Sequence, residues 1–366
     1  MRRALSGDMG REETPVALVD LERVKANAGR VADYCRAHGI AWRPHVKTHK
    51  SLQIASVQLA AGAAGLTVAT PREAEVMATI CDDILLAYPP LGPSKLDRLM
   101  ALSAQVDLTV GLDSRRALDE LAAAATSAGR RVGVLVEIDV GLGRMGVTTS
   151  GEAAALASLA AAAEGVEYRG IMFYPGHIRT PAEEQDEALG VLGKRLLEVL
   201  EVLRRDGLEP SIVSGGSSPT LWRSHEMPGI TEVRAGTVIY NDRDMLAMGV
   251  CGSEDLAYAV VGTVVSTAVP GQAVLDTGSK ALAKESFRSM GGGFGFVLEH
   301  PEVPVRSLSE EHGVLDLSRT DWAPEVGERV RVVPNHVCVS VNLQDRCLVD
   351  TGSGLEAWPI QARGRT

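Results

Sequence analysis

Residues 132–173, VGVLVEIDVGLGRMGVTTSGEAAALASLAAAAEGVEYRGIMF, contain the pattern that decides the fold. The apolar run at 132–137 predicts a buried strand, and the alanine-rich segment at 151–163 predicts a helix. A second apolar run follows at 168–173. A strand, a helix and a second strand in this order are typical of a βα unit that contributes to a parallel sheet.

The same alternation repeats on both sides of this stretch. Apolar runs that predict strands lie at 40–43, 65–68, 84–87, 106–110, 132–137, 168–173, 210–213 and 232–235. Helical segments separate them at 52–61, 71–81, 94–104, 114–128, 151–163 and 181–206, and a short irregular piece lies near 220–225. Strands and helices that alternate eight times favour a (β/α)8 TIM barrel, which we place at residues 14–244.

Two segments outside the predicted strands complete the expected organisation. A helix at 21–37 precedes the first strand, and Asp20 is its expected N-cap. After residue 244 short β-type runs are broken by Gly, Pro and Asp, at 258–265, 273–275, 295–297, 313–315, 329–333 and 346–349. We therefore expect a small β domain at 245–366, with residues 1–13 either disordered or packed on it.

Composition and charge favour a small-molecule partner. The 366 residues carry 37 Lys and Arg against 47 Asp and Glu, a formal net charge of −10, which argues against a nucleic-acid or membrane partner. The first residues do not resemble a secretory leader, and no apolar run reaches the 18 residues of a membrane span. The five cysteines form no CxxC pair, which fits a reducing compartment. We expect a cytoplasmic protein.

A basic motif follows the first predicted strand, at the end of a TIM barrel that carries active sites. The motif is RPHVKTHK (43–50), and Lys47 lies among its basic residues. Their positive charge disfavours protonation of the Lys47 amine, and the neutral amine is the form that attacks a carbonyl. Lys47 is therefore a candidate for covalent attachment of an aldehyde cofactor. A solvated basic loop is the structural alternative.

Glycine-rich loops follow three other predicted strands. In VGLGRMG (140–146) the glycines let the backbone approach a ligand, and Arg144 can offer its guanidinium to a carboxylate or phenolate. The loops SGGSS (214–218) and RAGT (234–237) expose backbone N–H groups that can bind a phosphate, as the loops after strands seven and eight of such barrels often do. Turns without a ligand are the alternative.

Histidine and cysteine side chains suggest a metal site and an acid or base. His336 and Cys338 in PNHVC are two positions apart. In an extended segment their side chains point to one face, where they can bind one cation. Two protein ligands leave the remaining positions to water and substrate oxygens. His177 follows the sixth strand and is a candidate acid or base. Ordinary structural roles are the alternative for all three residues.

Together these motifs resemble the fold-type III pyridoxal phosphate enzymes, and within them the D-threonine aldolase and D-serine dehydratase family. RPHVKTHK is similar to the family's lysine motif, which implies that Lys47 binds pyridoxal phosphate. VGLGRMG is similar to the arginine motif, which implies that Arg144 contacts the cofactor's phenolic oxygen. The resemblance of the two phosphate-binding loops implies contacts from Ser214, Gly215, Gly216, Gly236, Thr237 and Tyr240.

The same resemblance extends to two further positions. PNHVC is similar to the family's metal motif, which implies that His336 and Cys338 bind a divalent metal ion, zinc, manganese or magnesium. Arg234 resembles the racemase residue that lies near the pyridine nitrogen. An arginine there would keep that nitrogen unprotonated and limit the cofactor's strength as an electron sink.

The resemblance implies an alanine racemase-like barrel, a homodimer and a lyase that acts on D-β-hydroxy amino acids. We expect an aldolase, in which a base such as His177 removes the β-hydroxyl proton and the Cα–Cβ bond breaks to give glycine and an aldehyde. The alternative is a D-serine or D-threo-3-hydroxyaspartate dehydratase, because the best-known D-threonine aldolases carry Asp where Cys338 stands. An amino acid racemase and a non-catalytic pyridoxal phosphate-binding protein are further alternatives.

Overall fold

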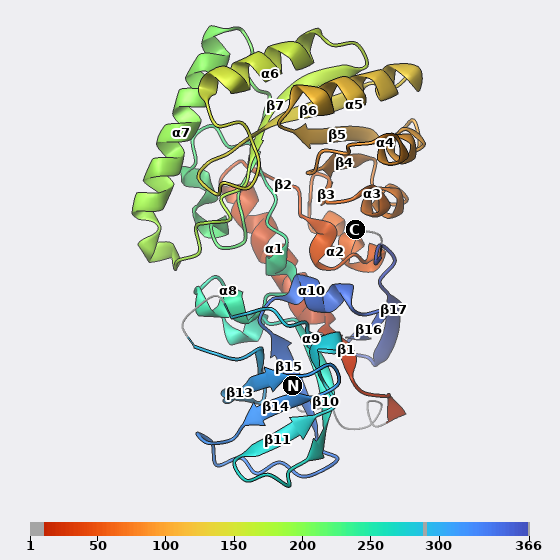
Figure 1. Cartoon of the computed structure of the whole chain (residues 1–366), viewed down its shortest axis with the longest axis vertical. Helices are drawn as coiled ribbons and strands as arrows, with labels where there is room; N and C mark the ends of the chain where they lie inside the picture. The colour runs from red at the N-terminus through yellow and green to blue at the C-terminus, as the bar shows by residue number, and fades with distance from the viewer. Residues whose placement is uncertain (1–10, 288–290, 365–366) are drawn as a thin grey trace. The chain divides into compact units, whose positions relative to one another are not determined.

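The computed structural model describes residues 11–287 and 291–364. This part of the chain forms two compact units, which contain the labelled elements of Figure 1. The barrel unit consists mainly of residues 29–47 and 55–236. The β unit consists of residues 48–54 and 237–363 together with the N-terminal segment up to Ala28. Segments from both ends of the sequence therefore share the β unit.

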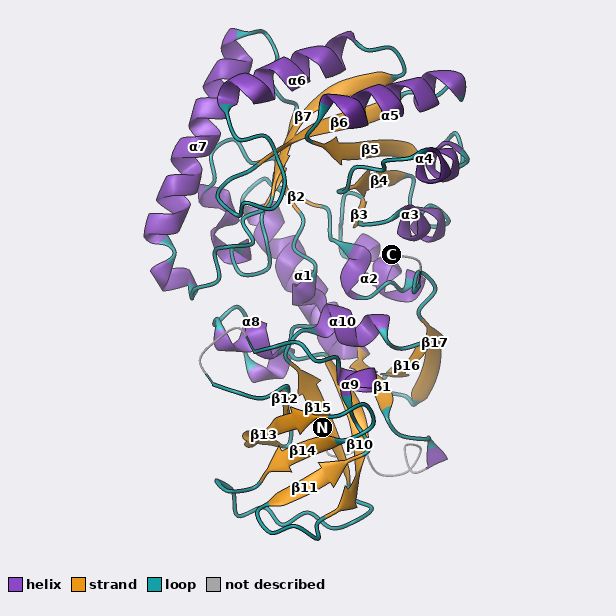
Figure 2. Ribbon diagram, in the orientation of Figure 1, coloured by secondary structure: helices purple, strands orange, loops and turns teal. Residues whose placement is uncertain are grey.

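Among the described residues, the barrel unit is built on eight parallel strands (Figure 2). They are β2 (Ala41–Trp42), β3 (Leu66–Val68), β4 (Asp83–Leu86), β5 (Asp107–Leu112), β6 (Val132–Ile138), β7 (Val166–Phe173), β8 (Ile212–Gly215) and β9 (Glu232–Val233). Neighbouring strands follow the order β2-β9-β8-β7-β6-β5-β4-β3. His45 and Thr67 form a parallel bridge, and the Thr67 N–H donates to the Pro44 carbonyl at 2.9 Å. These contacts join β2 to β3 and close the predicted barrel.

Helices alternate with these strands along the chain. They are α2 (Leu52–Ala60), α3 (Pro71–Met77), α4 (Pro93–Met100), α5 (Arg115–Ser127), α6 (Ser150–Ala162) and α7 (Asp186–Arg205), with 3-10 turns η3 (Ala182–Glu184) and η4 (Leu221–Glu226). Polar side chains begin them as the sequence suggests: Thr149 and Glu152 form a capping box on α6, and Ser114 caps α5. Each predicted helix is found, with its ends shifted by a few residues.

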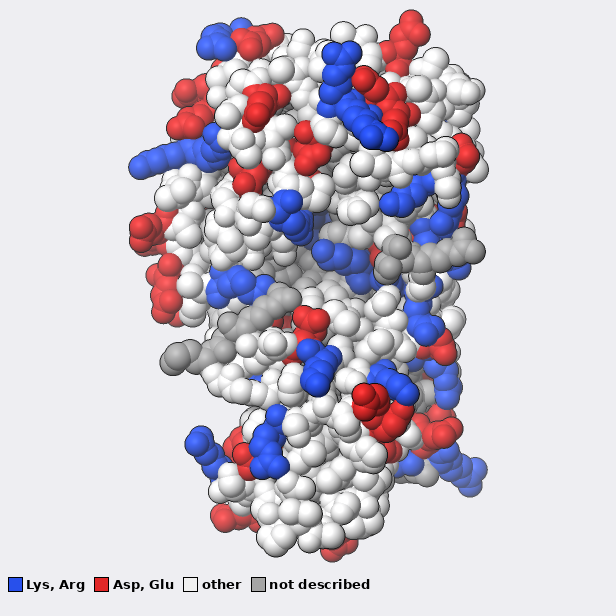
Figure 3. Space-filling model, in the orientation of Figure 1, with Lys and Arg blue, Asp and Glu red and all other residues white. Residues whose placement is uncertain are grey.

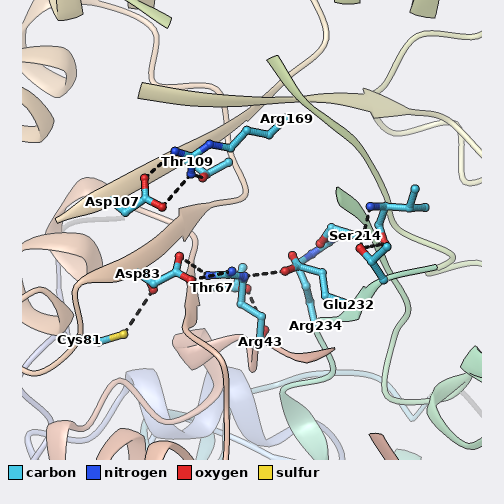
Figure 4. Close-up of polar contacts among 12 residues, drawn as sticks. Arg43, Thr67, Cys81, Asp83, Asp107, Thr109, Arg169, Ser214, Glu232 and Arg234 are labelled. Carbon is cyan, nitrogen blue, oxygen red and sulfur yellow. Dashed lines mark hydrogen bonds and ion pairs between the residues drawn. The ribbon is translucent and has the colours of Figure 1, made fainter. Parts of the chain in front are cut away.

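Two arginines pair with carboxylates on the first residues of barrel strands (Figure 4). Arg169 of β7 forms an ion pair with Asp107, the first residue of β5, at 2.7 Å. Arg43 binds both oxygens of Asp83 at 2.6 and 2.9 Å, and its Nε donates to Glu232 at 2.9 Å. Because these guanidinium groups are paired with carboxylates, their charges are neutralised inside the fold.

The next layer along the strands is apolar. Leu85 of β4, Leu135 of β6 and Met172 of β7 form one buried cluster. Since β4 and β6 are not neighbours in the sheet, these side chains meet inside the barrel. Gly111 of β5 leaves the space that Met172 occupies, because a Cβ there would lie 2.2 Å from the Met172 sulfur.

The β unit is built on a mostly antiparallel sheet. Its strands are β1 (Val16–Asp20), β10 (Tyr258–Ser266), β11 (Gln272–Leu275), β12 (Gly295–Val297), β13 (His300–Leu308), β14 (Gly313–Asp316), β15 (Arg329–Pro334), β16 (Arg346–Asp350) and β17 (Leu355–Pro359). Within the described chain, six strands close a ring in the order β10-β11-β14-β13-β12-β15. β1 pairs with β10 and, in parallel, with β16.

Short helices accompany this sheet. They are α8 (Arg243–Ala247), α9 (Ser279–Leu282) and α10 (Val337–Asn342), with η5 (Thr237–Ile239) and η6 (Ser253–Asp255). Helix α1 (Leu21–Ala37) starts after Asp20, whose Oδ1 accepts a hydrogen bond from the Arg23 N–H at 3.0 Å, so the predicted N-cap is found. β1, β13, β17 and α10 were not predicted, and β1 belongs to the β unit although it precedes the barrel in sequence.

Charged side chains of both signs are mixed on the face drawn in Figure 3. This mixture agrees with the modest net charge of −10. No helix in the described segments is long and apolar enough to cross a membrane.

Candidate active site

Lys47 lies in the 3-10 turn η2 (Val46–Thr48), which follows β2. Its Nζ is 5.9 Å from the centre of the Tyr174 ring, just after β7. The charge of Arg43, which the sequence suggested as a source of positive potential at Lys47, is neutralised by Asp83 and Glu232. Contrary to the prediction, Arg43 is therefore not a source of positive potential at Lys47, and the better evidence for Lys47 is its place beyond the end of a barrel strand.

Arg144 contacts the same aromatic ring. Its Cζ lies 4.9 Å from the Tyr174 ring centre, and its Nη2 lies 3.9 Å from Oε1 of Glu137 on β6. The Arg144 side chain is 52% exposed, so its remaining N–H groups are open to a ligand. The structure therefore brings Lys47 and Arg144 together around Tyr174, a residue that no sequence motif singled out.

The loop that carries Arg144 has a defined backbone. Oδ1 of Asp139 accepts hydrogen bonds from the N–H groups of Gly141 and Gly143 at 3.1 and 3.0 Å. Both glycines have positive φ, +117° and +67°, which residues with side chains rarely adopt. His177 is exposed, and a Cβ on Gly141 would lie 3.3 Å from its Nε2. The candidate acid or base therefore lies against the arginine loop.

The loop after β8 is shaped by close packing and by Arg234. A Cβ on Gly215 would lie 2.1 Å from the Phe173 ring, so only glycine fits there, and Gly216 has a φ of +83°. Arg234 is buried and donates hydrogen bonds to Ser214 Oγ at 2.5 Å and to the Phe173 carbonyl at 2.8 Å (Figure 4). Burial lowers the pKa of Arg234. Ser214 therefore accepts a hydrogen bond from the arginine that is predicted to lie near the cofactor ring.

The remaining residues predicted at the phosphate site follow directly in the chain. Gly236 precedes η5, which begins at Thr237, and Tyr240 follows that turn. Tyr240 is buried in the β unit, with its ring centre 5.6 Å from that of Tyr258 and 6.4 Å from that of His49. Burial raises the pKa of Tyr240, so the hydroxyl keeps its proton and remains a possible donor. Phosphate contacts from these residues stay a prediction.

His336 and Cys338 meet in the β unit by a different geometry from the one expected. The sequence predicts an extended segment for both residues, but a helix, α10, begins at Val337. His336 is its N-cap, and Cys338 lies in its first turn. The two side chains nevertheless contact each other through a hydrogen bond. The expected pairing is found at the start of a helix.

Asp242 holds His336 in place. Its Oδ2 lies 3.0 Å from His336 Nδ1 and accepts a hydrogen bond from the Val337 N–H at 3.0 Å. Burial lowers the pKa of His336, but the Cys338 thiolate and the Asp242 carboxylate outweigh this effect and raise it to about 11. With Nδ1 bound to a carboxylate, Nε2 is left for a metal ion, which is the usual arrangement of histidine ligands.

The donor set fits a divalent metal ion bound by two protein ligands. An imidazole nitrogen and a thiolate in contact are ligands that zinc accepts. Thr48, which follows Lys47 in the chain, has its Oγ1 3.3 Å from the Cys338 sulfur. No group of three or more His, Cys, Asp or Glu side chains suited to a metal occurs among the described residues. The other coordination positions would therefore fall to water and substrate, as in a catalytic site.

Comparison with protein families shows the family to which the chain belongs. The family described as "Alanine racemase, N-terminal domain" matches residues 19–244, and a serine dehydratase domain matches residues 257–349. The chain belongs to the alanine racemase-like family. This membership confirms the predicted fold, a barrel followed by a separate β domain, and the expected resemblance.

Similar proteins and solved structures indicate the class of reaction. The chain is 34% identical to D-threo-3-hydroxyaspartate dehydratase of Delftia sp. (strain HT23), over 90% of this chain and 91% of the relative. It is 32% identical to D-threonine aldolase of Arthrobacter sp, over 99% and 96%. The crystal structure of D-threonine aldolase from Filomicrobium marinum covers 97% of both chains with a TM-score of 0.89 and 29% identity.

Two solved mutants of D-threo-3-hydroxyaspartate dehydratase bear on the metal pair. One is a histidine-to-alanine mutant, with a TM-score of 0.88, 31% identity and 98% coverage of this chain. The other is a cysteine-to-alanine mutant in the metal-free form, with a TM-score of 0.87, 30% identity and the same coverage. The mutated histidine and cysteine are two positions apart, as are His336 and Cys338.

These similarities confirm the prediction that the protein is a lyase. The aldolases and the dehydratase among the relatives share its whole length and match the function expected from the sequence. They also support the expected use of pyridoxal phosphate and a divalent metal. The roles of individual site residues stay predictions.

Proposed function

We propose that this chain is a pyridoxal phosphate- and divalent metal-dependent lyase that cleaves D-β-hydroxy amino acids into glycine and an aldehyde. The observation that carries the proposal is the convergence of Lys47 and Arg144 on the Tyr174 ring, where the barrel strands end. Bound there, pyridoxal phosphate supplies a sink for the electrons released at Cα, and a metal ion supplies a Lewis acid for the β-hydroxyl.

Different barrel residues would bind different parts of the cofactor. Lys47 binds its aldehyde, and Arg144 donates hydrogen bonds to its phenolic oxygen. Arg234 would face the ring nitrogen. Two facts support this placement: its hydrogen bonds go to the neutral oxygens of Ser214 and Phe173, and it forms no ion pair within the described chain. Backbone N–H groups of the glycine loops bind the phosphate, in a set made of Ser214, Gly215, Gly216, Gly236, Thr237 and Tyr240.

The β unit supplies the metal ligands. His336 and Cys338 bind the ion, and Asp242 keeps Nε2 of His336 free by occupying Nδ1. A metal-free form of a cysteine mutant of the dehydratase relative supports the role of Cys338. His177 removes the proton from the substrate's β-hydroxyl, which its exposure beside the arginine loop permits.

A dehydratase is the second candidate, and Cys338 favours it. The dehydratase relative has a mutated cysteine two positions after a mutated histidine, as the His336 and Cys338 pair has here. In that reaction Lys47 would remove the Cα proton, and His336 and Cys338 would hold a metal that supplies a Lewis acid for the leaving β-hydroxyl. A solved alanine racemase is 22% identical and shows the fold alone, so it does not favour a racemase.

One assay separates these candidates. The purified holoenzyme with zinc or manganese is incubated with D-threonine, D-serine and D-threo-3-hydroxyaspartate, with the L-enantiomers as controls. Glycine and acetaldehyde from D-threonine support the aldolase. Keto acid and ammonia without glycine would instead establish the dehydratase, and no turnover of any D-substrate would contradict both.

We also propose that the protein is a homodimer in the cytoplasm. The five cysteines all lie in the described part of the chain and form no disulfide bond, which agrees with a reducing compartment. Light scattering of the holoenzyme after size-exclusion chromatography measures the assembly, and a mass of one chain would contradict the dimer.

A further inference from the structure

Glu137 is a buried carboxylate inside the barrel, near the ends of the strands. It follows Leu135 on β6 by two residues, and side chains two apart on a strand share a face. Since Leu135 belongs to the apolar cluster inside the barrel, Glu137 also points inward, one step closer to the active-site end. Its exposure is only 3%.

The charge of Glu137 is not fully satisfied by the fold. Its Oε2 is buried without a hydrogen-bond partner among the described residues. Oε1 has a cation no closer than Arg144 at 3.9 Å. The buried Glu232 also has one oxygen, Oε1, without a hydrogen-bond partner, but its Oε2 accepts a charge-assisted hydrogen bond from Arg43 at 2.9 Å. A buried carboxylate without partners destabilises a folded chain, so its presence at this position calls for another reason.

The geometry of Arg144 supplies that reason. Arg144 is half-exposed, and an arginine in that state samples many rotamers unless something restrains it. The Tyr174 ring contacts one face of its guanidinium, and Glu137 attracts it from the barrel interior. At 3.9 Å this attraction is electrostatic and uses no N–H group in a hydrogen bond. The donors therefore stay available while the guanidinium is kept in place.

We propose that Glu137 is a positioning residue that holds the Arg144 guanidinium toward the cofactor. This inference rests on the proposed cofactor role of Arg144. The carboxylate acts through Arg144 and does not touch the cofactor. Burial raises the pKa of Glu137 while Arg234 and Arg144 oppose that rise, which agrees with a carboxylate retained for its interaction with cations.

The variant Glu137→Gln keeps the shape and removes the charge. We expect its dissociation constant for pyridoxal phosphate, measured by absorbance titration of the full-length protein freed of cofactor, to rise about tenfold. We expect the unfolding temperature of the cofactor-free variant to stay the same or rise by about 2 °C, because an unpaired buried charge is removed. Glu137→Asp, which keeps the charge, should recover part of the affinity.

Three controls separate this role from a structural one. Glu232→Gln removes a buried carboxylate that has a close partner, so it should lower the unfolding temperature and leave the affinity for pyridoxal phosphate unchanged. Arg144→Ala should weaken cofactor binding by itself. In the Arg144→Ala background, Glu137→Gln should change the dissociation constant less than twofold, because its effect passes through Arg144.

The outcomes that contradict the inference are distinct from failure of the proposed function. A fall of both affinity and unfolding temperature in Glu137→Gln would show a structural role and overturn it. An unchanged affinity in Glu137→Gln, with a loss in Arg144→Ala, would also overturn it while leaving the cofactor site intact. An unchanged affinity in Arg144→Ala would contradict the proposed cofactor site itself.

Discussion

The barrel contains two sets of arginines that differ in the partners of their guanidinium groups. Arg43 and Arg169 form close ion pairs with carboxylates on the first residues of strands. Arg144 and Arg234, where strands end, have a carboxylate at 3.9 Å and neutral oxygens as their respective partners. Paired arginines stabilise the barrel, whereas incompletely paired ones remain available to an anionic ligand. This difference separates structural charge from functional charge in one protein.

The largest effect on activity is expected from a substitution in the second set, Arg144 and Arg234. Arg144→Ala should reduce kcat/KM by on the order of 10³-fold, because a donor to a charged oxygen of the cofactor is removed. The unfolding temperature should hardly change, since the side chain is half-exposed. Steady-state kinetics and calorimetry measure the two quantities, and a large loss of stability would erase the distinction between the two sets.

The opposite result is expected for Arg43→Met. This change leaves Glu232, which is only 4% exposed, without its cation and should lower the free energy of unfolding by about 3 kcal/mol. The activity per folded molecule should stay close to that of the unmodified enzyme. Denaturant titration and kinetics on the folded fraction test this prediction, which a selective loss of kcat would contradict.

The metal pair gives a third test, in the β unit. Asp242→Asn should weaken metal affinity by about 10- to 100-fold, because the carboxylate that orients His336 is replaced by a weaker acceptor. Competition with a zinc-binding dye measures the affinity. Asp316→Asn, at a half-buried position of β14, is the matched control and should leave the affinity unchanged. Equal metal affinities in the unmodified enzyme and in both variants would show that Asp242 does not support metal binding.

The smallest effect concerns the pH dependence of stability. Glu137, near Asp113, Asp139, Arg144 and Arg234, has a pKa raised above its ordinary value by burial. A carboxylate with a raised pKa in the folded state loses stability as pH rises from the unfolded to the folded pKa. The advantage of cofactor-free Glu137→Gln in unfolding temperature should thus be largest near neutral pH and shrink toward pH ~4. A difference in unfolding temperature between the two proteins that stays constant across pH would contradict this prediction.

Much of the barrel was predictable because its strands and helices carry local signals. The eight apolar runs, the alternating helices and the Asp20 cap all follow from residue spacing and type. The strand β1 was missed because its pairing partners, β10 and β16, are distant in sequence. The strand β17 pairs with β16, which directly precedes it, and was missed because its residues, LEAWP, include no β-branched side chain. The helix at Val337 was missed because the local pattern of valines favours a strand.

The candidate site was predictable only in part. Motifs pointed to Lys47, Arg144, His336 and Cys338, but not to the groups that position them. Tyr174 and Asp242 contact their partners across segments that are far apart in the chain, whereas Glu137 lies seven residues before Arg144. A buried acidic residue at the end of a strand, directly before a glycine loop with an arginine, was the available signal for Glu137.

The attachment of the cofactor to Lys47 is the central claim, and one measurement tests it directly. The holoenzyme is reduced with borohydride, digested and analysed by mass spectrometry, with Lys50 in the same motif as an internal comparison. A phosphopyridoxyl group on Lys47 alone is the predicted result. Modification of Lys50, or an unmodified Lys47 in protein that contains the cofactor, would contradict the account.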